Sequence, residues 1–206
     1  MTKIKICGTT NKHDAILASQ LGADMLGFIF YKGSKRYVEP KTAEDIINEL
    51  PPYILKVGVF VNETPENVRR IAADAALNAL QFHGDETPEY CRAFKDEFKV
   101  IKAFRLKDRK SLDGINKYDA DYYLLDTYSE DSHGGTGEVF DWNILEDFEF
   151  LKPVILSGGI TPDNVAKAIK KVAPYGVDVA SGVEASPGVK DAELLKRFIH
   201  NVRKED

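Results

Sequence analysis

The sequence predicts a single-domain α/β protein, a (βα)8 or TIM barrel in which eight parallel strands alternate with helices. Short apolar runs rich in Val, Ile and Phe recur along the 206 residues, and each is followed by a helical pattern. No linker interrupts this alternation, so one catalytic domain is expected over residues 1–206. Eight units leave about 26 residues for each, which is short but sufficient for this barrel.

The expected strands are the apolar runs at residues 3–7, 25–30, 54–61, 79–83, 100–104, 122–126, 153–157 and 177–181. Thr64, Thr87 and Thr161 each precede Pro and an acidic residue, a sequence that predicts a helix start with Thr as the N-cap. Gly22 suits the end of the first helix, and Cys91 is interpreted as a packing residue inside a helix. A doubly wound open sheet is the alternative fold, but the turn after the first strand lacks the GxGxxG pattern.

Composition and charge exclude several classes of protein. With 28 Lys and Arg against 33 Asp and Glu, the net charge is -5, and no basic stripe is present to bind nucleic acid. No apolar run is long enough to span a bilayer and the first residues do not resemble a signal peptide, so we expect a cytoplasmic protein with no membrane partner. The two cysteines, Cys7 and Cys91, have no CxxC pair or His cluster nearby, and no metal site is expected.

A phosphate site is predicted after the last two strands. Gly158 and Gly159 follow the seventh strand, and Ser181 and Gly182 end the eighth. Loops of this kind leave backbone N–H groups accessible to an anion, and phosphate sites are frequent at this place in the barrel. The alternative interpretation is that the glycines only permit tight turns.

Cys7 and Asp126 are the candidate catalytic pair. They end the first and sixth expected strands, on opposite sides of the ring, where they could flank one bound substrate. A thiolate whose pKa is lowered by nearby cations or amides could remove a proton, and a protonated carboxyl group could donate one. The alternatives are that Cys7 is a small buried apolar residue and that Asp126 caps the loop that follows it.

Three further residues lie near the same end of the expected barrel. Arg36 could bind a substrate carboxylate with two hydrogen bonds, although such residues are often simply solvated. His83 could support the site by hydrogen bonding or be structural, and Asp178 lies on the eighth strand. Residues 133–137 read HGGTG and are interpreted as a mobile loop over the site, because no GxSxG nucleophile motif accompanies them.

These motifs together resemble the phosphoribosylanthranilate isomerase family, in order, from about residue 3 to residue 191. The segments that carry the resemblance are KICGTTN at 5–11, GFIF at 27–30, SKRY at 34–37, VGVFVN at 57–62, QFHG at 81–84, LDT at 125–127, GGTG at 134–137, LSGGITPDNV at 156–165, DVASGVE at 178–184 and GVKD at 188–191. The first segment combined with the SGVE sequence is the most specific part.

The resemblance implies an isomerase of tryptophan biosynthesis that carries out an Amadori rearrangement of N-(5-phosphoribosyl)anthranilate without a cofactor. Asp126 would be the general acid that protonates the ribose ring oxygen, and Cys7 the general base that removes the C2 proton. Arg36 would bind the anthranilate carboxylate, and the glycine loops at residues 158–159 and 181–182 the phosphate. His83 and Asp178 would line the site.

Two other functions remain open from the sequence. Another sugar-phosphate barrel isomerase would share the phosphate loops, but the histidine-pathway enzyme predicts Asp where this chain has Cys7. A catalytically silent barrel that binds a phosphorylated ligand would lack Cys7 or Asp126, and both are present. In each case the partner is a small molecule, and the sequence leaves open whether the chain is a monomer or a homodimer.

Overall fold

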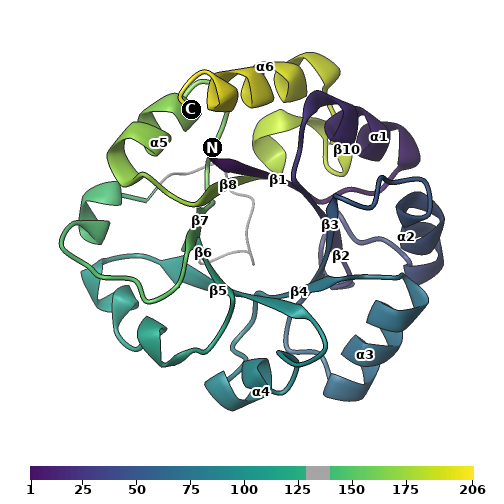
Figure 1. Ribbon diagram of the computed structural model, residues 1–206, viewed down its shortest axis with the longest axis horizontal. Coiled ribbons are helices and arrows are strands. Elements are labelled where there is room, and N and C mark those ends of the chain that lie inside the picture. The colour runs from purple at the N-terminus through teal and green to yellow at the C-terminus, as the bar shows by residue number, and fades with distance from the viewer. Residues whose placement is uncertain (129–139) are drawn as a thin grey trace.

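The computed structural model describes residues 1–128 and 140–206 and confirms the predicted barrel. Eight parallel strands pair in chain order and the last pairs with the first, forming the ring in Figure 1. They are β1 (Lys3–Cys7), β2 (Met25–Ile29), β3 (Leu55–Phe60), β4 (Ala79–Phe82), β5 (Lys99–Leu106), β6 (Tyr122–Thr127), β7 (Val154–Leu156) and β8 (Gly176–Val179). Several predicted strands extend one or two residues too far, so Ser157 lies in the loop after β7 and Ser181 begins a short 3-10 helix after β8.

Helices cover the outside of the ring (Figure 1). The α-helices among the described residues are α1 (Lys12–Leu21), α2 (Pro40–Ile47), α3 (Pro65–Asp74), α4 (Pro88–Arg92), α5 (Val165–Val172) and α6 (Ala192–Arg203). After β5 the predicted helix is replaced by two short 3-10 helices, η1 (Arg109–Leu112) and η2 (Ile115–Lys117). Gly114 separates them with a φ of 82°, a left-handed conformation that a continuous helix cannot contain. The described part of the connection after β6 contains only η3 (Trp142–Leu145).

Helix ends follow the sequence signals at three of the four positions. The side chains of Thr64 and Thr87 accept hydrogen bonds from the third residue of their helices, and Gly22 ends α1 with a φ of 105°. The helix start predicted at Thr161 is wrong, because α5 begins at Val165. The Asn164 side chain accepts a hydrogen bond from the backbone of Thr161 at 2.8 Å and holds this segment as a turn.

An antiparallel hairpin follows β8 that the sequence analysis did not predict. The chain passes through η4 (Ser181–Val183), β9 (Glu184–Ser186) and β10 (Val189–Lys190) before it enters α6. Its strands are too short to give an alternating pattern. The hairpin places two charged side chains, Glu184 and Lys190, beside the end of β1.

The barrel interior changes from apolar to polar along the strands. Side chains alternate between the inside and the helix-covered outside. The inward residues near the strand starts form a small apolar cluster of Met25, Val57, Ala79, Ile101, Ala103, Leu124 and Ile155. Toward the carboxyl ends the inward positions carry Lys5, Cys7, Gln81, Asp126 and Asp178, all buried. None of the helices in the described ranges could cross a membrane.

Candidate active site

A pocket at the carboxyl ends of the strands collects the sequence-predicted site residues. We call it the central pocket, and its lining includes Cys7, Arg36, His83, Asp126, Ser157, Gly158, Gly159, Asp178 and Ser181. Gly182 is the one predicted residue outside this lining. A side chain there would place its Cβ 2.1 Å from the carbonyl oxygen of Ile160, so this glycine allows η4 to pack against the loop after β7.

Cys7 ends β1 and is buried with its side chain toward the pocket. Burial raises the pKa of its thiol above the usual value, while the Lys5 ammonium acts most strongly in the opposite direction. The sequence analysis made the base role of Cys7 conditional on nearby cations or amides that lower this pKa. Cations are indeed present, but the cost of placing a charge in the buried site exceeds their effect on the pKa.

Asp126 and His83 contact each other on the other side of the pocket. Nε2 of His83 lies 3.1 Å from Oδ2 of Asp126, and the second oxygen of Asp126 accepts a hydrogen bond from the backbone N–H of Thr127 at 2.9 Å. Gln81 on β4 places its Nε2 at 2.8 Å from Nδ1 of His83. A chain of three side chains therefore ends at the carboxyl group of Asp126.

Arg36 is held by a carboxylate from the hairpin. Its Nε and Nη2 donate to the two oxygens of Glu184 at 2.7 to 3.0 Å. Lys190 donates to the same carboxylate at 2.9 Å and to the backbone oxygen of Cys7 at 2.6 Å. Despite the burial of Glu184, which by itself raises its pKa, Arg36 and Lys190 hold that pKa below its usual value. Arg36 is thus an oriented side chain and not a solvated one.

Asp178 connects the eighth strand to the first strand and to the loop after the seventh. One oxygen accepts from Nζ of Lys5 at 2.9 Å and the other from Oγ of Ser157 at 3.0 Å. All three side chains are buried. These contacts fix the carboxylate at the edge of the central pocket.

The loop after β7 has a backbone that requires glycine. Gly158 and Gly159 have φ values of 79° and 64°, in the left-handed region. A Cβ on Gly158 would lie 2.3 Å from both the backbone nitrogen and the side-chain oxygen of Thr127. The Asn164 side chain donates to the carbonyl oxygen of Gly159 at 2.8 Å and so braces the loop. The loop that the sequence predicts to bind phosphate therefore forms part of the pocket wall, where its backbone is not covered by side chains of its own.

Sequence reasoning gave no role to four charged or polar residues of this site: Lys5, Gln81, Glu184 and Lys190. Lys5 and Gln81 could have been found from the alternation of their strands, which turns them inward. Glu184 and Lys190 depend on the unpredicted hairpin. The segment at residues 133–137, interpreted from the sequence as a loop over the site, lies outside the described residues.

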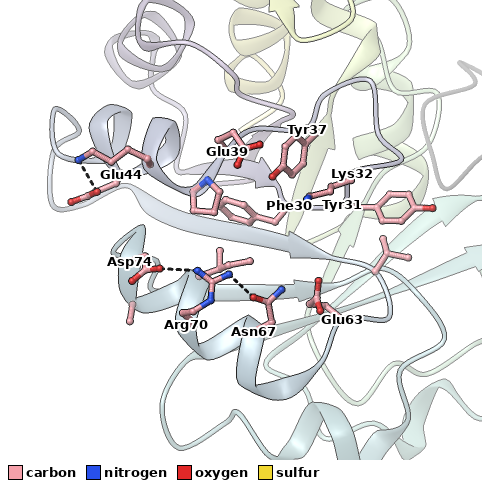
Figure 2. A pocket seen from close by; sticks show the side chains of 15 residues that line it. Phe30, Tyr31, Lys32, Tyr37, Glu39, Glu44, Glu63, Asn67, Arg70 and Asp74 are labelled. Carbon is pink, nitrogen blue, oxygen red and sulfur yellow. Dashed lines mark hydrogen bonds and ion pairs between the residues drawn. The ribbon is translucent and has the colours of Figure 1, made fainter.

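A larger groove lies outside the barrel between α2 and α3 (Figure 2). Its volume is about 1010 Å³, and four of its charged side chains form ion pairs, Lys41 with Glu44 and Arg70 with Asp74. Arg70 binds Asp74 at 3.2 Å and Asn67 at 2.6 Å, and Figure 2 shows it lying between them. The lining side chains that Figure 2 draws do not point toward one common position as a set of reactive groups would. Among the described residues, no cluster of three His, Cys, Asp or Glu side chains is placed to bind a metal ion.

Comparison with known proteins places the chain in a family. The family model for N-(5'phosphoribosyl)anthranilate (PRA) isomerase matches residues 4–201. The N-(5'-phosphoribosyl)anthranilate isomerases of Trichlorobacter lovleyi and Desulforudis audaxviator are each 50% identical to this chain, and each alignment covers 98% of both chains.

Solved structures agree with these sequence matches. The phosphoribosyl anthranilate isomerase of Thermotoga maritima superposes with a TM-score of 0.90 and 41% identity over 99% of this chain and all of its own. A phosphoribosyl anthranilate isomerase in complex with reduced 1-(o-carboxyphenylamino)-1-deoxyribulose 5-phosphate gives a TM-score of 0.86 and 40% identity over 99% of this chain and all of its own. The chain therefore belongs to the phosphoribosylanthranilate isomerase family.

Proposed function

We propose that this protein converts N-(5'-phosphoribosyl)anthranilate to 1-(2-carboxyphenylamino)-1-deoxyribulose 5-phosphate, a step of tryptophan biosynthesis. The observation that carries the proposal is the central pocket, in which a buried thiol and a carboxyl group line one cavity in a chain of this family. The related structure with a bound reduced product shows that such a ligand binds a protein of this fold.

Asp126 is the general acid in this reaction. It donates a proton to the ribose ring oxygen, the bond from that oxygen to C1 breaks, and the nitrogen lone pair forms an iminium. The acid form needs a proton on Asp126, and His83 is the group placed to share it. If the Gln81 amide turns over, its unpartnered oxygen accepts the proton of Nδ1, and Nε2 of His83 can then accept from a protonated Asp126.

Cys7 is the general base in the second step. Its thiolate removes the proton from C2 of the iminium, and the electrons of that bond form the enolamine. Tautomerisation of the enolamine gives the ketone product, so atoms and charge balance without an external reactant. Cys7 suits this step because it reaches the pocket from β1, while Asp126 reaches it from β6.

The remaining site residues bind the two charged ends of the substrate. Arg36 binds the anthranilate carboxylate, for which Glu184 orients its guanidinium. The backbone around Gly158, Gly159, Ser181 and Gly182 binds the phosphate. His83 and Asp178 line the pocket between these ends.

The proposal extends to the protein as a whole. Residues 1–206 act as one catalytic domain, no organic cofactor or metal ion takes part, and the active form is a monomer or a homodimer. The reaction takes place in the cytoplasm, because a substrate with both a phosphate and a carboxylate does not cross membranes unaided.

Turnover tests the proposal directly. The substrate is generated in situ from anthranilate and phosphoribosyl pyrophosphate with its synthesising enzyme, and its fluorescence is followed after the purified protein is added with a chelator. We expect rapid loss of fluorescence with formation of the ketone product. No loss with folded protein would contradict the proposal and would favour another sugar-phosphate substrate or a silent binding barrel.

A further inference from the structure

Lys5 is a lysine inside the barrel with no access to solvent. Its ammonium group contacts one carboxylate, Asp178, at 2.9 Å. Burial of a charged group is costly unless partners compensate for the lost water, so a fully buried lysine needs an explanation. An apolar residue at this position would extend the apolar cluster below it without that cost.

Lys5 lies next to Cys7 in space as well as in sequence. The two residues are separated by one position on β1, so both side chains turn into the barrel. A Cβ on Gly27 of β2 would lie 2.8 Å from Sγ of Cys7 and 3.1 Å from Nζ of Lys5, which limits the distance between these two atoms to less than 6 Å. Gly27 thus leaves the space in which the ammonium and the thiol approach each other.

Charged side chains surround Cys7 on this side of the pocket. The cations are Lys5, Lys190 and Arg36, and the carboxylates are Asp178, Glu184 and Asp14, which accepts from the backbone N–H of Lys190 at 2.7 Å. Asp126 and His83 form their own pair across the pocket. Of the cations, Lys5 is the one that shares β1 with Cys7.

We propose that Lys5 is a positioning residue that favours the thiolate form of Cys7 against the cost of burial, with Asp178 keeping the Lys5 ammonium in place beside the sulfur atom. This inference rests on the proposed role of Cys7 as the base. Lys5 is not among the described residues that line the central pocket, so it acts on the reaction through Cys7 and not through the substrate.

The balance of electrostatic effects agrees with this role. Among the influences on Cys7, the Lys5 ammonium lowers the pKa of the thiol more than any other group, against the increase caused by burial. Burial alone would lower the pKa of Lys5, but Asp178 and Cys7 together hold that pKa above its usual value. Lys5 therefore stays charged although it is fully buried.

The test measures the thiol itself. The rate of alkylation of Cys7 by iodoacetamide is followed from pH 5 to 10, with peptide mass spectrometry to separate Cys7 from Cys91. In Lys5→Met we expect the pKa of Cys7 to rise by about one unit or more, because an opposite charge within a few ångströms has been removed. The pKa that defines the acidic limb of the pH profile of kcat/KM should rise together with the pKa of Cys7. In Lys56→Met, a matched variant of a buried lysine on β3, the pKa of Cys7 should be unchanged.

A second variant keeps the polar contact but removes the charge. Lys5→Gln can still donate a hydrogen bond to Asp178 but is neutral, so the pKa of Cys7 should rise as in Lys5→Met. An unchanged alkylation profile in Lys5→Met overturns the inference, and if that variant does not fold, an unchanged profile in Lys5→Gln overturns it. Since alkylation needs no substrate, lack of turnover with normal profiles would contradict only the proposed function.

Discussion

Replacing Glu184 by Gln should destabilise the protein and weaken substrate binding together. Glu184 is buried and neutralises two cations, Arg36 and Lys190, through hydrogen bonds of 2.7 to 3.0 Å. Gln keeps the shape but leaves both cations without their counter-charge. Hydrogen bonds to charged groups contribute about 1.5–3 kcal/mol, and breaking a buried ion pair costs about 3–5 kcal/mol.

We expect Glu184→Gln to lower the free energy of unfolding by about 3 kcal/mol. For a chain of this size each kcal/mol shifts the Tm by about 2–4 °C, so the Tm should fall by about 6–12 °C. The KM should rise by about tenfold, because Arg36 loses the partner that orients it toward a carboxylate. Thermal unfolding by circular dichroism and steady-state kinetics measure the two effects.

The loss of stability in Glu184→Gln should also depend on pH. Because the pKa of Glu184 is lowered in the folded protein, its contribution to stability is complete above the ordinary glutamate pKa of about 4.3 and is lost as the pH falls through its folded-state pKa. The difference in Tm between the two proteins should therefore shrink at acid pH.

A surface ion pair provides the control for Glu184→Gln. Glu44 binds Lys41 at 2.9 Å, but the Lys41 side chain is 73% exposed, so Glu44→Gln should cost at most about 0.5 kcal/mol. Similar Tm changes in the two variants, or an unchanged KM in Glu184→Gln, would refute the reasoning.

Three further predictions concern the pocket wall and the chain ends. Gly158→Ala should raise the KM strongly and lower the Tm, because the new Cβ would lie 2.3 Å from Thr127 in the pocket wall. Gly22→Ala is the control: its φ is also strained for alanine, but the space around it is open, so only the Tm should fall. Arg36→Lys keeps the charge but loses the two-pronged geometry, so kinetics should show a higher KM with a smaller change in kcat. Removal of Asp206, which accepts a hydrogen bond from the backbone of Thr2 at 2.6 Å, should lower the Tm by a few degrees in a thermal melt.

The architecture was predictable because strand and helix signals in this chain are local. Apolar runs gave all eight barrel strands to within a few residues, and Thr64 and Thr87 marked helix starts with side chains that cap them. The same local signal failed at Thr161. The Thr161 side chain accepts from the backbone N–H of Asp163 at 3.3 Å and the Asn164 side chain accepts from the backbone N–H of Thr161 at 2.8 Å, and these local hydrogen bonds hold a turn before the helix begins.

The sequence could predict the site residues that lie at the carboxyl ends of barrel strands, but not the partners that reach them from elsewhere in the chain. Once a barrel is assumed, Cys7 and Asp126 must end at one face, and both line the central pocket. The partner of Arg36 was not predictable, because Glu184 is 148 residues away and reaches it through a hairpin of very short strands. The raised pKa of Cys7 was equally hidden, since it depends on how completely the sulfur atom is buried.

The most direct test of the account is the kcat of Cys7→Ser and Asp126→Asn beside the unmodified protein, with Cys91→Ser as the control for a buried cysteine outside the pocket. Single-turnover measurements with excess protein separate the chemical steps from substrate binding. The account predicts that each pocket variant loses at least about 100-fold in rate, while Cys91→Ser keeps nearly full activity. A rate within about tenfold of the unmodified protein in either pocket variant would contradict the assignment of the acid and the base.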